Sequence, residues 1–195
     1  IRDEDKMPLD GKNAFVVCAL DRYGMASALV ESGCNLKIGD LAFALGVPIF
    51  PTTLPTLRIV ADVLMPILGH MPISVLYPTG KSQEQVIPKF TSIYQWADII
   101  GGDCHFIKKH MPEDLSGKVI ITNTVTEDDV KAFRARGVRT LVVSTPEFSG
   151  RSFATNVIDA MLVAITGRSP EDFTPSDYLD ILTKLEFRPR IEVLQ

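Results

Sequence analysis

Residues 137–167, GVRTLVVSTPEFSGRSFATNVIDAMLVAITG, give the clearest indication of the fold. The β-branched run at 140–143 predicts a buried strand, the polar residues 144–152 predict a turn, and residues 152–165 predict a helix. The first N–H groups of a helix lack partners within the helix, and its dipole favours negative charge there. A strand, a polar turn with a glycine and a helix N-terminus therefore predict an anion-binding site.

Units of strand, turn and helix also occur on either side of this stretch. Apolar or β-branched runs predict strands at residues 14–20, 35–38, 97–100 and 119–122. Further elements are predicted as helices at 21–33, 54–68, 81–96 (interrupted near Pro88), 126–136 and 175–185, a helical turn at 41–45, a short strand at 73–76 and an edge strand in 187–195. This alternation predicts the α/β class, as a Rossmann-like three-layer sandwich with a mostly parallel sheet.

Size, charge and hydropathy narrow the class of protein. A chain of 195 residues suits a single Rossmann-like domain, with a Pro-rich helical insertion at about residues 46–96. The net charge of −4 argues against binding to nucleic acid or to an acidic membrane surface. The apolar region 57–77 is broken by Asp62, His70 and prolines, so no membrane span is predicted. Because the chain begins with Ile1, we expect a fragment or processed form that lacks an upstream domain.

The cysteines favour a reducing compartment. Cys18, Cys34 and Cys104 are odd in number, lie far apart and form no CxxC pair. Cys18 lies in an apolar run, where a cysteine behaves as a small hydrophobic residue. The charged N-terminus does not resemble a signal peptide. A cytoplasmic protein is therefore expected rather than a secreted disulfide framework.

Polar side chains follow most of the predicted strands, and in parallel sheets ligands bind at the carboxyl ends of the strands. The candidate ligand-binding residues there are Arg22, Asp40, Asn123, Thr124, Ser144, Thr145, Gly150, Arg151, Ser152 and Asn156. Arg151 suits a phosphate or carboxylate, and its alternative role is a surface ion pair. Asn123 and Thr124 suit ribose or an amide group, and their alternative role is to stabilise a turn. Together these residues predict a pocket for a small-molecule ligand.

The first strand–helix unit matches part of the dinucleotide-binding fingerprint. Ala26, Leu29 and Gly33 take the positions of that motif's small residue, apolar residue and closing glycine. Asp40 then lies at the end of the second strand, where an acidic residue binds the ribose hydroxyls. The three glycines of the phosphate-binding turn are replaced by Val17, Ala19 and Arg22.

Asp103 and His105 are the candidate catalytic residues. They follow the strand at 97–100, and a carboxylate beside an imidazole can act as an acid–base pair because histidine titrates near neutral pH. The alternative is a loop histidine bonded to local backbone. Their spacing to Cys104 and His110 matches no zinc motif, so no metal site is assigned.

Several runs resemble a family. LDGKNAFVVCALDRYGMASALVESG, CNLKIGDLAFALG, ADIIGGDCHFIKKHMPEDLSGKVIITNTVT and PEFSGRSFATNV are similar to a family of uncharacterised bacterial proteins that often carry the label quinate 5-dehydrogenase. The resemblance covers nearly the whole chain. It implies a Rossmann-like domain that uses NAD or NADP on a cyclohexane carboxylic acid, as in quinate and shikimate dehydrogenases.

Three functional hypotheses follow. The first is a nucleotide- or small-anion-binding protein that acts as an NAD(P)-dependent oxidoreductase. The second is a non-catalytic ligand-binding or regulatory module that has lost dinucleotide chemistry. The third is a subunit whose catalytic groups come from upstream residues. The Met- and Leu-containing stripe at 65–76 predicts core or a dimer surface, so a homo-oligomer is also considered.

Overall fold

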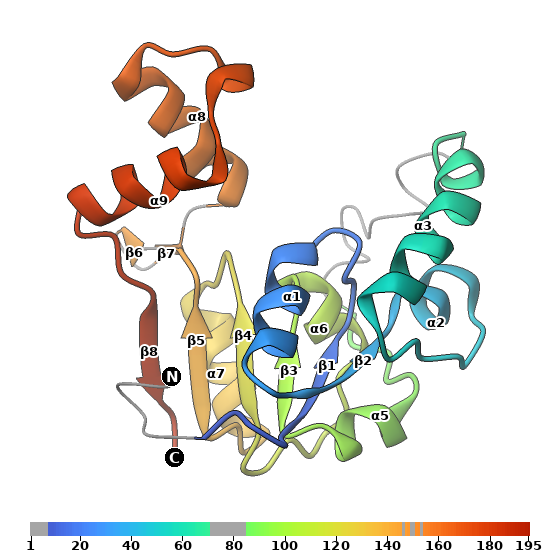
Figure 1. Ribbon diagram of the computed structural model, residues 1–195. Helices are drawn as coiled ribbons and strands as arrows, with labels where there is room; N and C mark the ends of the chain where they lie inside the picture. Colours follow the sequence, from blue (N-terminus) through green and yellow to red (C-terminus); the bar gives the residue numbers. More distant parts are fainter. Residues whose placement is uncertain (1–7, 71–84, 146, 149–150, 153) are drawn as a thin grey trace.

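The computed structural model describes residues 8–70, 85–145, 147–148, 151–152 and 154–195, and it has an α/β architecture (Figure 1). Among these residues the main sheet has six strands in the order β2-β1-β3-β4-β5-β8. Neighbours among β1 to β5 pair in parallel, and β8 pairs with β5 antiparallel. The strands are β1 (Asn13–Val16), β2 (Asn35–Ile38), β3 (Ile99–Gly101), β4 (Val119–Thr122), β5 (Thr140–Val143) and β8 (Arg190–Val193).

Helices and a small hairpin connect these strands. They are α1 (Tyr23–Glu31), α2 (Asp40–Leu45), α3 (Leu54–Leu68), α5 (Thr91–Trp96), α6 (Cys104–His110), α7 (Glu127–Ala135), α8 (Thr155–Thr166), the 3₁₀ turn Pro170–Asp172, α9 (Pro175–Lys184), and strands β6 (Glu147–Phe148) and β7 (Arg151–Ser152). Two helix starts are fixed by capping boxes, in which a threonine and an aspartate exchange hydrogen bonds. Thr126 and Asp129 start α7, and Thr174 and Asp177 start α9.

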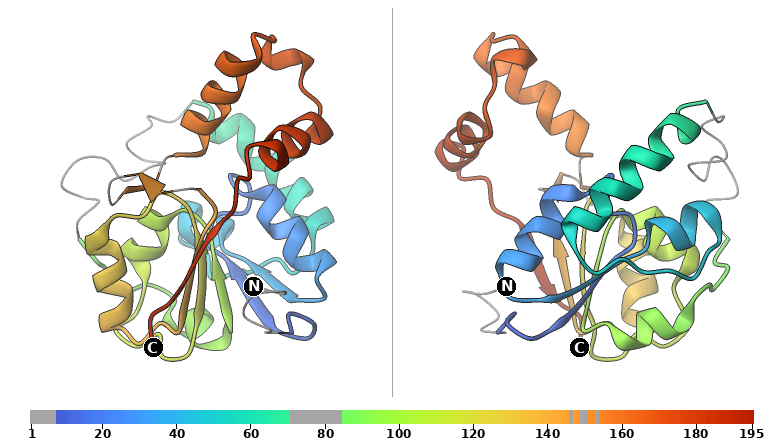
Figure 2. Two further views of the ribbon diagram at one scale, coloured as in Figure 1. Left: turned by 90° about the vertical axis from the view of Figure 1, so that its left-hand side faces the viewer. Right: turned by 45° about the vertical axis from the view of Figure 1, so that its right-hand side comes forward.

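Helices cover both faces of the main sheet, which confirms the predicted Rossmann-like three-layer sandwich. Helix α1 lies on one face, and α6 and α7 lie on the other (Figures 1 and 2). Successive side chains of a strand point to opposite faces. Val16 therefore packs in one core cluster with Ala26 of α1, whereas Phe15 packs in the other with Tyr94 of α5 and Ile107 of α6. Within the described residues, no helix is both long and apolar enough to cross a membrane.

The predicted elements agree in part with the structure. The strand predicted at 14–20 is wrong over residues 17–20, because β1 ends at Val16. The strands at 35–38, 119–122 and 140–143 and the helix at 54–68 are confirmed with the same bounds. The helix at 81–96 is wrong over residues 85–90, because α5 begins only at Thr91, after Phe90 with a left-handed φ of 52°. Residues 81–84 and the short strand predicted at 73–76 lie outside the described residues.

Three helices extend beyond the carboxyl end of the sheet (Figures 1 and 2). Helices α8 and α9 stand above the strands, and α3 projects on the side of β2 (Figures 1 and 2). The two C-terminal helices contact each other, because the Tyr178 hydroxyl donates to Asp159 over 2.6 Å. Arg168 binds Asp177 over 2.9 Å and lies over the ring of Phe173. These contacts join α8, α9 and the segment between them to one another.

Candidate functional site

The strand order places a topological switch point between β1 and β3. From β1 the chain passes through α1 to β2 on one side, whereas from β3 it passes through α6 to β4 on the other. Helices α1 and α6, which follow β1 and β3, lie on opposite faces of the sheet (Figure 1). Open α/β sheets bind ligands at such switch points. The predicted residues that follow β1 and β3 are Arg22, Asp103 and His105.

Asp40 binds the loop that follows β1. Its carboxylate accepts the backbone N–H of Ala19 over 2.8 Å and that of Leu20 over 2.9 Å, and the residue is 4% exposed. Burial raises the pKa of Asp40, and these hydrogen bonds oppose the shift. The sequence predicted an Asp40 open to ribose. The structure instead places it inside the chain, where it is the anion that the first strand–helix loop binds.

Glycines allow close approach at the ends of β2 and β3 rather than in the turn after β1. Gly102 has a φ of 146°, and a Cβ there would lie 3.3 Å from Cβ of Val17. A Cβ on Gly39 would lie 2.6 Å from the carbonyl oxygen of Val17. The loop after β1 is therefore approached closely by Gly39, which follows β2, and by Gly102, which follows β3. A search for a glycine-rich turn within the loop itself would overlook these two glycines.

Arg22 and Asp103 meet across the switch point. Arg22 Nη2 lies 3.4 Å from Oδ2 of Asp103, and Nη1 lies 3.1 Å from Oδ2 of Asp21. The other oxygen of Asp103 accepts the N–H of His105 over 2.9 Å and so caps α6. His105 is half-buried in the first turn of that helix. The structure thus brings these predicted residues together, with Asp103 already bonded on both oxygens.

A second group of predicted residues lies at the carboxyl ends of β4 and β5. The N–H of Ser144 donates to the carbonyl of Thr122 over 2.8 Å, and the N–H of Ser152 donates to that of Val125 over 3.2 Å. These two bonds bracket Asn123 and Thr124 between β5 and the β6–β7 hairpin. Thr124 has a left-handed φ of 47°, which a β-branched residue adopts only under constraint.

Buried polar oxygens in this second group have no partner. Asn123 is 4% exposed, Thr145 4% and Ser152 2%. Among the described residues, Asn123 Oδ1, Thr145 Oγ1 and Ser152 Oγ accept or donate no hydrogen bond, and Nε of Arg22 is in the same state. Such groups destabilise a protein unless water or a ligand satisfies them. The carboxyl ends of β4 and β5 therefore carry buried polar atoms whose hydrogen-bonding capacity is unused.

The anion site predicted in residues 144–156 has a different form in the structure. The predicted helix start at Ser152 is wrong, because Arg151 and Ser152 form strand β7 of a hairpin and α8 begins only at Thr155. Asn156 is exposed on α8, and Ser144 is exposed after β5. Gly150 and the side chain of Arg151 lie outside the described residues. The helix therefore starts three residues later than predicted, after the hairpin.

Sequence reasoning missed a polar network that joins α6 to α7. The Lys108 ammonium binds the buried carboxylate of Asp129, which also accepts the N–H and hydroxyl of Thr126. Burial would raise the pKa of Asp129, but the hydrogen bonds from Lys108 and Thr126 outweigh it, so the pKa is lowered. The spacing of Thr126 and Asp129 is the signal of a capping box. Within the described residues, no group of three or more His, Cys, Asp or Glu side chains could hold a metal ion.

Comparison with known proteins adds a family but no activity. A family model described as a domain of unknown function (DUF8754) matches residues 1–194. The chain belongs to this family. No curated protein and no solved structure was found to match it. For this member of DUF8754, nucleotide binding and the resemblance to quinate dehydrogenase therefore stay predictions, and the edge described above is the candidate site.

Proposed function

We propose that the protein binds a small anionic molecule, of the nucleotide class or similar in its polar groups, at the carboxyl edge of β1, β3, β4 and β5. The observation that carries this proposal is the set of buried, unpartnered oxygens of Asn123, Thr145 and Ser152. A bound ligand with hydroxyl or amide groups would satisfy them. Arg22 is the cation at this edge: its Nε has no partner, and its terminal nitrogens contact Asp21 over 3.1 Å and Asp103 over 3.4 Å, so a bound anion would compete with these two carboxylates.

NAD or NADP is the finer candidate, and with it an oxidoreductase of the quinate or shikimate dehydrogenase type. The strand order and the switch point support a nucleotide at this edge. In that reaction Asp103 or His105 would move the proton. A pyrophosphate would have to bind without the N–H groups of Ala19 and Leu20, because Asp40 already accepts both. That occupation favours the second candidate, a ligand-binding or regulatory module without dinucleotide chemistry.

Thermal unfolding with added ligand separates these candidates. The probes are NAD, NADP, AMP, quinate and shikimate, each added to the full chain. A ligand at 100-fold over its Kd adds about 2.7 kcal/mol of stability, which raises Tm measurably. Stabilisation by AMP together with NAD or NADP supports a nucleotide site, and absence of a shift with all five probes contradicts the proposal.

Variants then locate the site and test catalysis. Arg22→Gln and Asn123→Ala should each remove the ligand-induced shift, whereas Arg188→Gln, an exposed arginine that precedes β8, should retain it. If NAD(P)-dependent turnover of quinate or shikimate is observed, Asp103→Asn and His105→Ala are compared for turnover and binding. Loss of turnover with retained binding supports acid–base catalysis, and retained turnover in both variants removes that assignment.

A further inference from the structure

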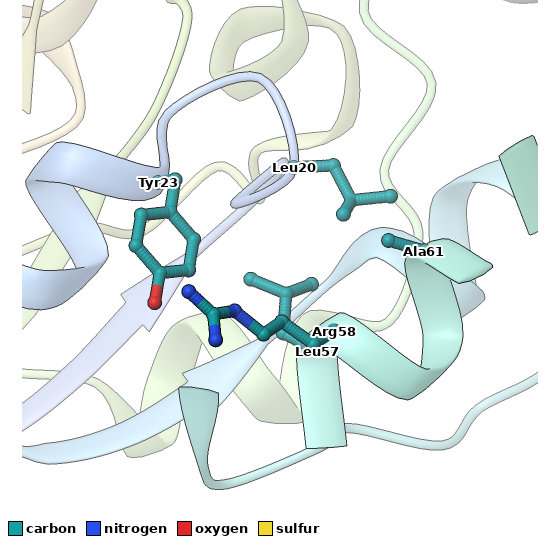
Figure 3. A pocket seen from close by; sticks show the side chains of 5 residues that line it. All are labelled: Leu20, Tyr23, Leu57, Arg58 and Ala61. Carbon is teal, nitrogen blue, oxygen red and sulfur yellow. The ribbon is translucent and has the colours of Figure 1, made fainter. Parts of the chain in front are cut away.

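A separate pocket lies between the start of α1 and the first turns of α3. It has a volume of about 260 Å³ and is lined by Leu20, Tyr23, Leu57, Arg58 and Ala61 (Figure 3). Clefts that hold drug-sized ligands measure roughly 300–1,000 Å³, so this pocket suits a more compact molecule. None of its five residues belongs to the site proposed above.

One side of the pocket is apolar and adjoins the core. Leu57 is fully buried in the core cluster that includes Ala26 and Leu29 of α1. The N–H of Leu20 donates to Asp40, which holds the turn that carries this side chain. Leu20 and Ala61 close one side of the pocket in Figure 3, with Leu57 behind them. This apolar side favours a ligand with a compact apolar body, because packing against it removes apolar surface from water.

The opposite side of the pocket carries a cation and a phenol. The guanidinium of Arg58 extends toward the ring of Tyr23, whose hydroxyl points to the same side (Figure 3). Asp62 lies one turn further along α3, at the spacing at which helical ion pairs form. In the described part of the chain, however, no ion pair or hydrogen bond is made by the Arg58 side chain, which is exposed. Arg58 therefore offers a guanidinium without an ion pair or hydrogen bond to the mouth of the pocket.

We infer that this pocket binds a small monocarboxylate with a compact apolar body. The carboxylate pairs with Arg58 and accepts a hydrogen bond from the Tyr23 hydroxyl, and the apolar body packs on Leu20, Leu57 and Ala61. Arginine suits carboxylates because its planar guanidinium donates two parallel hydrogen bonds. The inference stands apart from the proposed function, since it uses neither Arg22 nor the oxygens at β4 and β5.

Benzoate and benzamide form the test pair, because they share shape and differ in charge. Each is titrated into the isotopically labelled full chain, and the Ala61 methyl and the amides of Leu20 and Tyr23 are followed by NMR. Benzoate should give saturable shifts at these positions. Benzamide should bind about tenfold more weakly or worse, since hydrogen bonds to charged groups are the stronger ones. Equal affinity of the two, or shifts that avoid these residues, overturns the inference.

Two variants with matched controls make the test specific. Ala61→Trp fills the pocket and should abolish the benzoate shifts, whereas Ala164→Trp on the exposed side of α8 should leave them unchanged. Arg58→Gln should reduce the affinity for benzoate to that for benzamide, with Arg188→Gln as the control. Arg58→Gln changes no buried group, so it decides the question even if Ala61→Trp fails to fold. Retained benzoate affinity in Arg58→Gln contradicts the inference.

Discussion

The carboxyl edge of the sheet has two halves that differ in how their polar groups are satisfied. At β1 and β2, the carboxylate of Asp40 is buried and accepts two backbone N–H groups from the following loop. At β4 and β5, the buried oxygens of Asn123, Thr145 and Ser152 have no partner among the described residues. In the first half the carboxylate of Asp40 is satisfied within the chain, whereas Nε of Arg22, which follows β1, has no partner. We propose that a ligand satisfies the polar groups of the second half.

The largest expected effect is that of Asp40→Ala on the first half. It leaves one buried and one part-buried N–H group without an acceptor, so the free energy of unfolding should fall by about 2–5 kcal/mol. Urea denaturation of the ligand-free protein measures this, with Asp180→Ala on the exposed face of α9 as a neutral control. A loss below that of the control variant would show that Asp40 does not hold the loop.

Gly102→Ala tests how closely the two neighbouring loops must approach. At a φ of 146° the added Cβ is strained, and it would lie 3.3 Å from Cβ of Val17. Unfolding free energy should fall by about 1–3 kcal/mol. Gly24→Ala in α1 is the matched control, because a Cβ there meets no atom within 4 Å and alanine favours a helix. Equal stability of the two variants would contradict the close approach.

Thr145→Val probes the second half with the opposite sign. Valine keeps the shape of threonine and removes an unpartnered hydroxyl, so the ligand-free protein should be unchanged or more stable by up to about 1 kcal/mol. Thr126→Val removes a hydroxyl that works in a capping box and should cost about 1 kcal/mol. If Thr145→Val costs as much as Thr126→Val by thermal unfolding, the Thr145 hydroxyl has a partner and the contrast between the halves fails.

The smallest expected effect is a pH dependence of the free energy of unfolding. It should be present in the first half, which contains Asp40, and absent from the second. Burial raises the pKa of Asp40 above its ordinary value of 3.8. Between the unfolded pKa of 3.8 and the higher folded pKa, the folded state binds more protons than the unfolded state. The stability that this group contributes is therefore present below pH 3.8 and is lost as pH rises through the folded pKa. Relative to Asp40→Asn, the wild type should gain stability as pH is lowered through this window.

Thr145→Val gives the comparison for that titration. No titratable side chain is among Asn123, Thr145 and Ser152, so the stability difference between Thr145→Val and the wild type should not vary over the same pH range. Urea denaturation at several pH values measures both differences. A constant difference for Asp40→Asn would mean that Asp40 is not the group that titrates.

The sequence predicted those features of the fold that depend on neighbouring residues in the chain, and it did not predict those that depend on tertiary contacts. The α/β class and strands such as 140–143 follow from apolar runs, which local pattern reveals. The role of Asp40 could not be predicted in this way, because its position at the end of β2 fits both a ribose contact and the internal hydrogen bonds to Ala19 and Leu20. Only the tertiary approach of the two loops distinguishes them.

The candidate site was predictable as a set of strand ends but not as a set of bonds. Asn123, Thr145 and Asp103 were selected because they follow strands, and the structure places them at one edge. The β6–β7 hairpin was missed, since two strands of two residues leave no periodic pattern. Consequently the predicted helix start at Ser152 differs from the observed start at Thr155, and Asn156 lies on an exposed helix face rather than in the site.

The antiparallel pairing of β8 with β5 also has a consequence for local unfolding. Residues 144–189 leave the sheet after β5 and return to its edge at β8, so the sheet can stay paired while α8 and α9 open. If α8 and α9 open, residues 144–189 become one long loop, and the entropic cost of closing a loop grows only slowly with its length. The contacts between Tyr178 and Asp159 and between Arg168 and Asp177 are made within this segment, not with the sheet. Amide hydrogen exchange should therefore be faster in α8 and α9 than in β4 and β5. Equal protection would mean that the helices unfold only with the sheet.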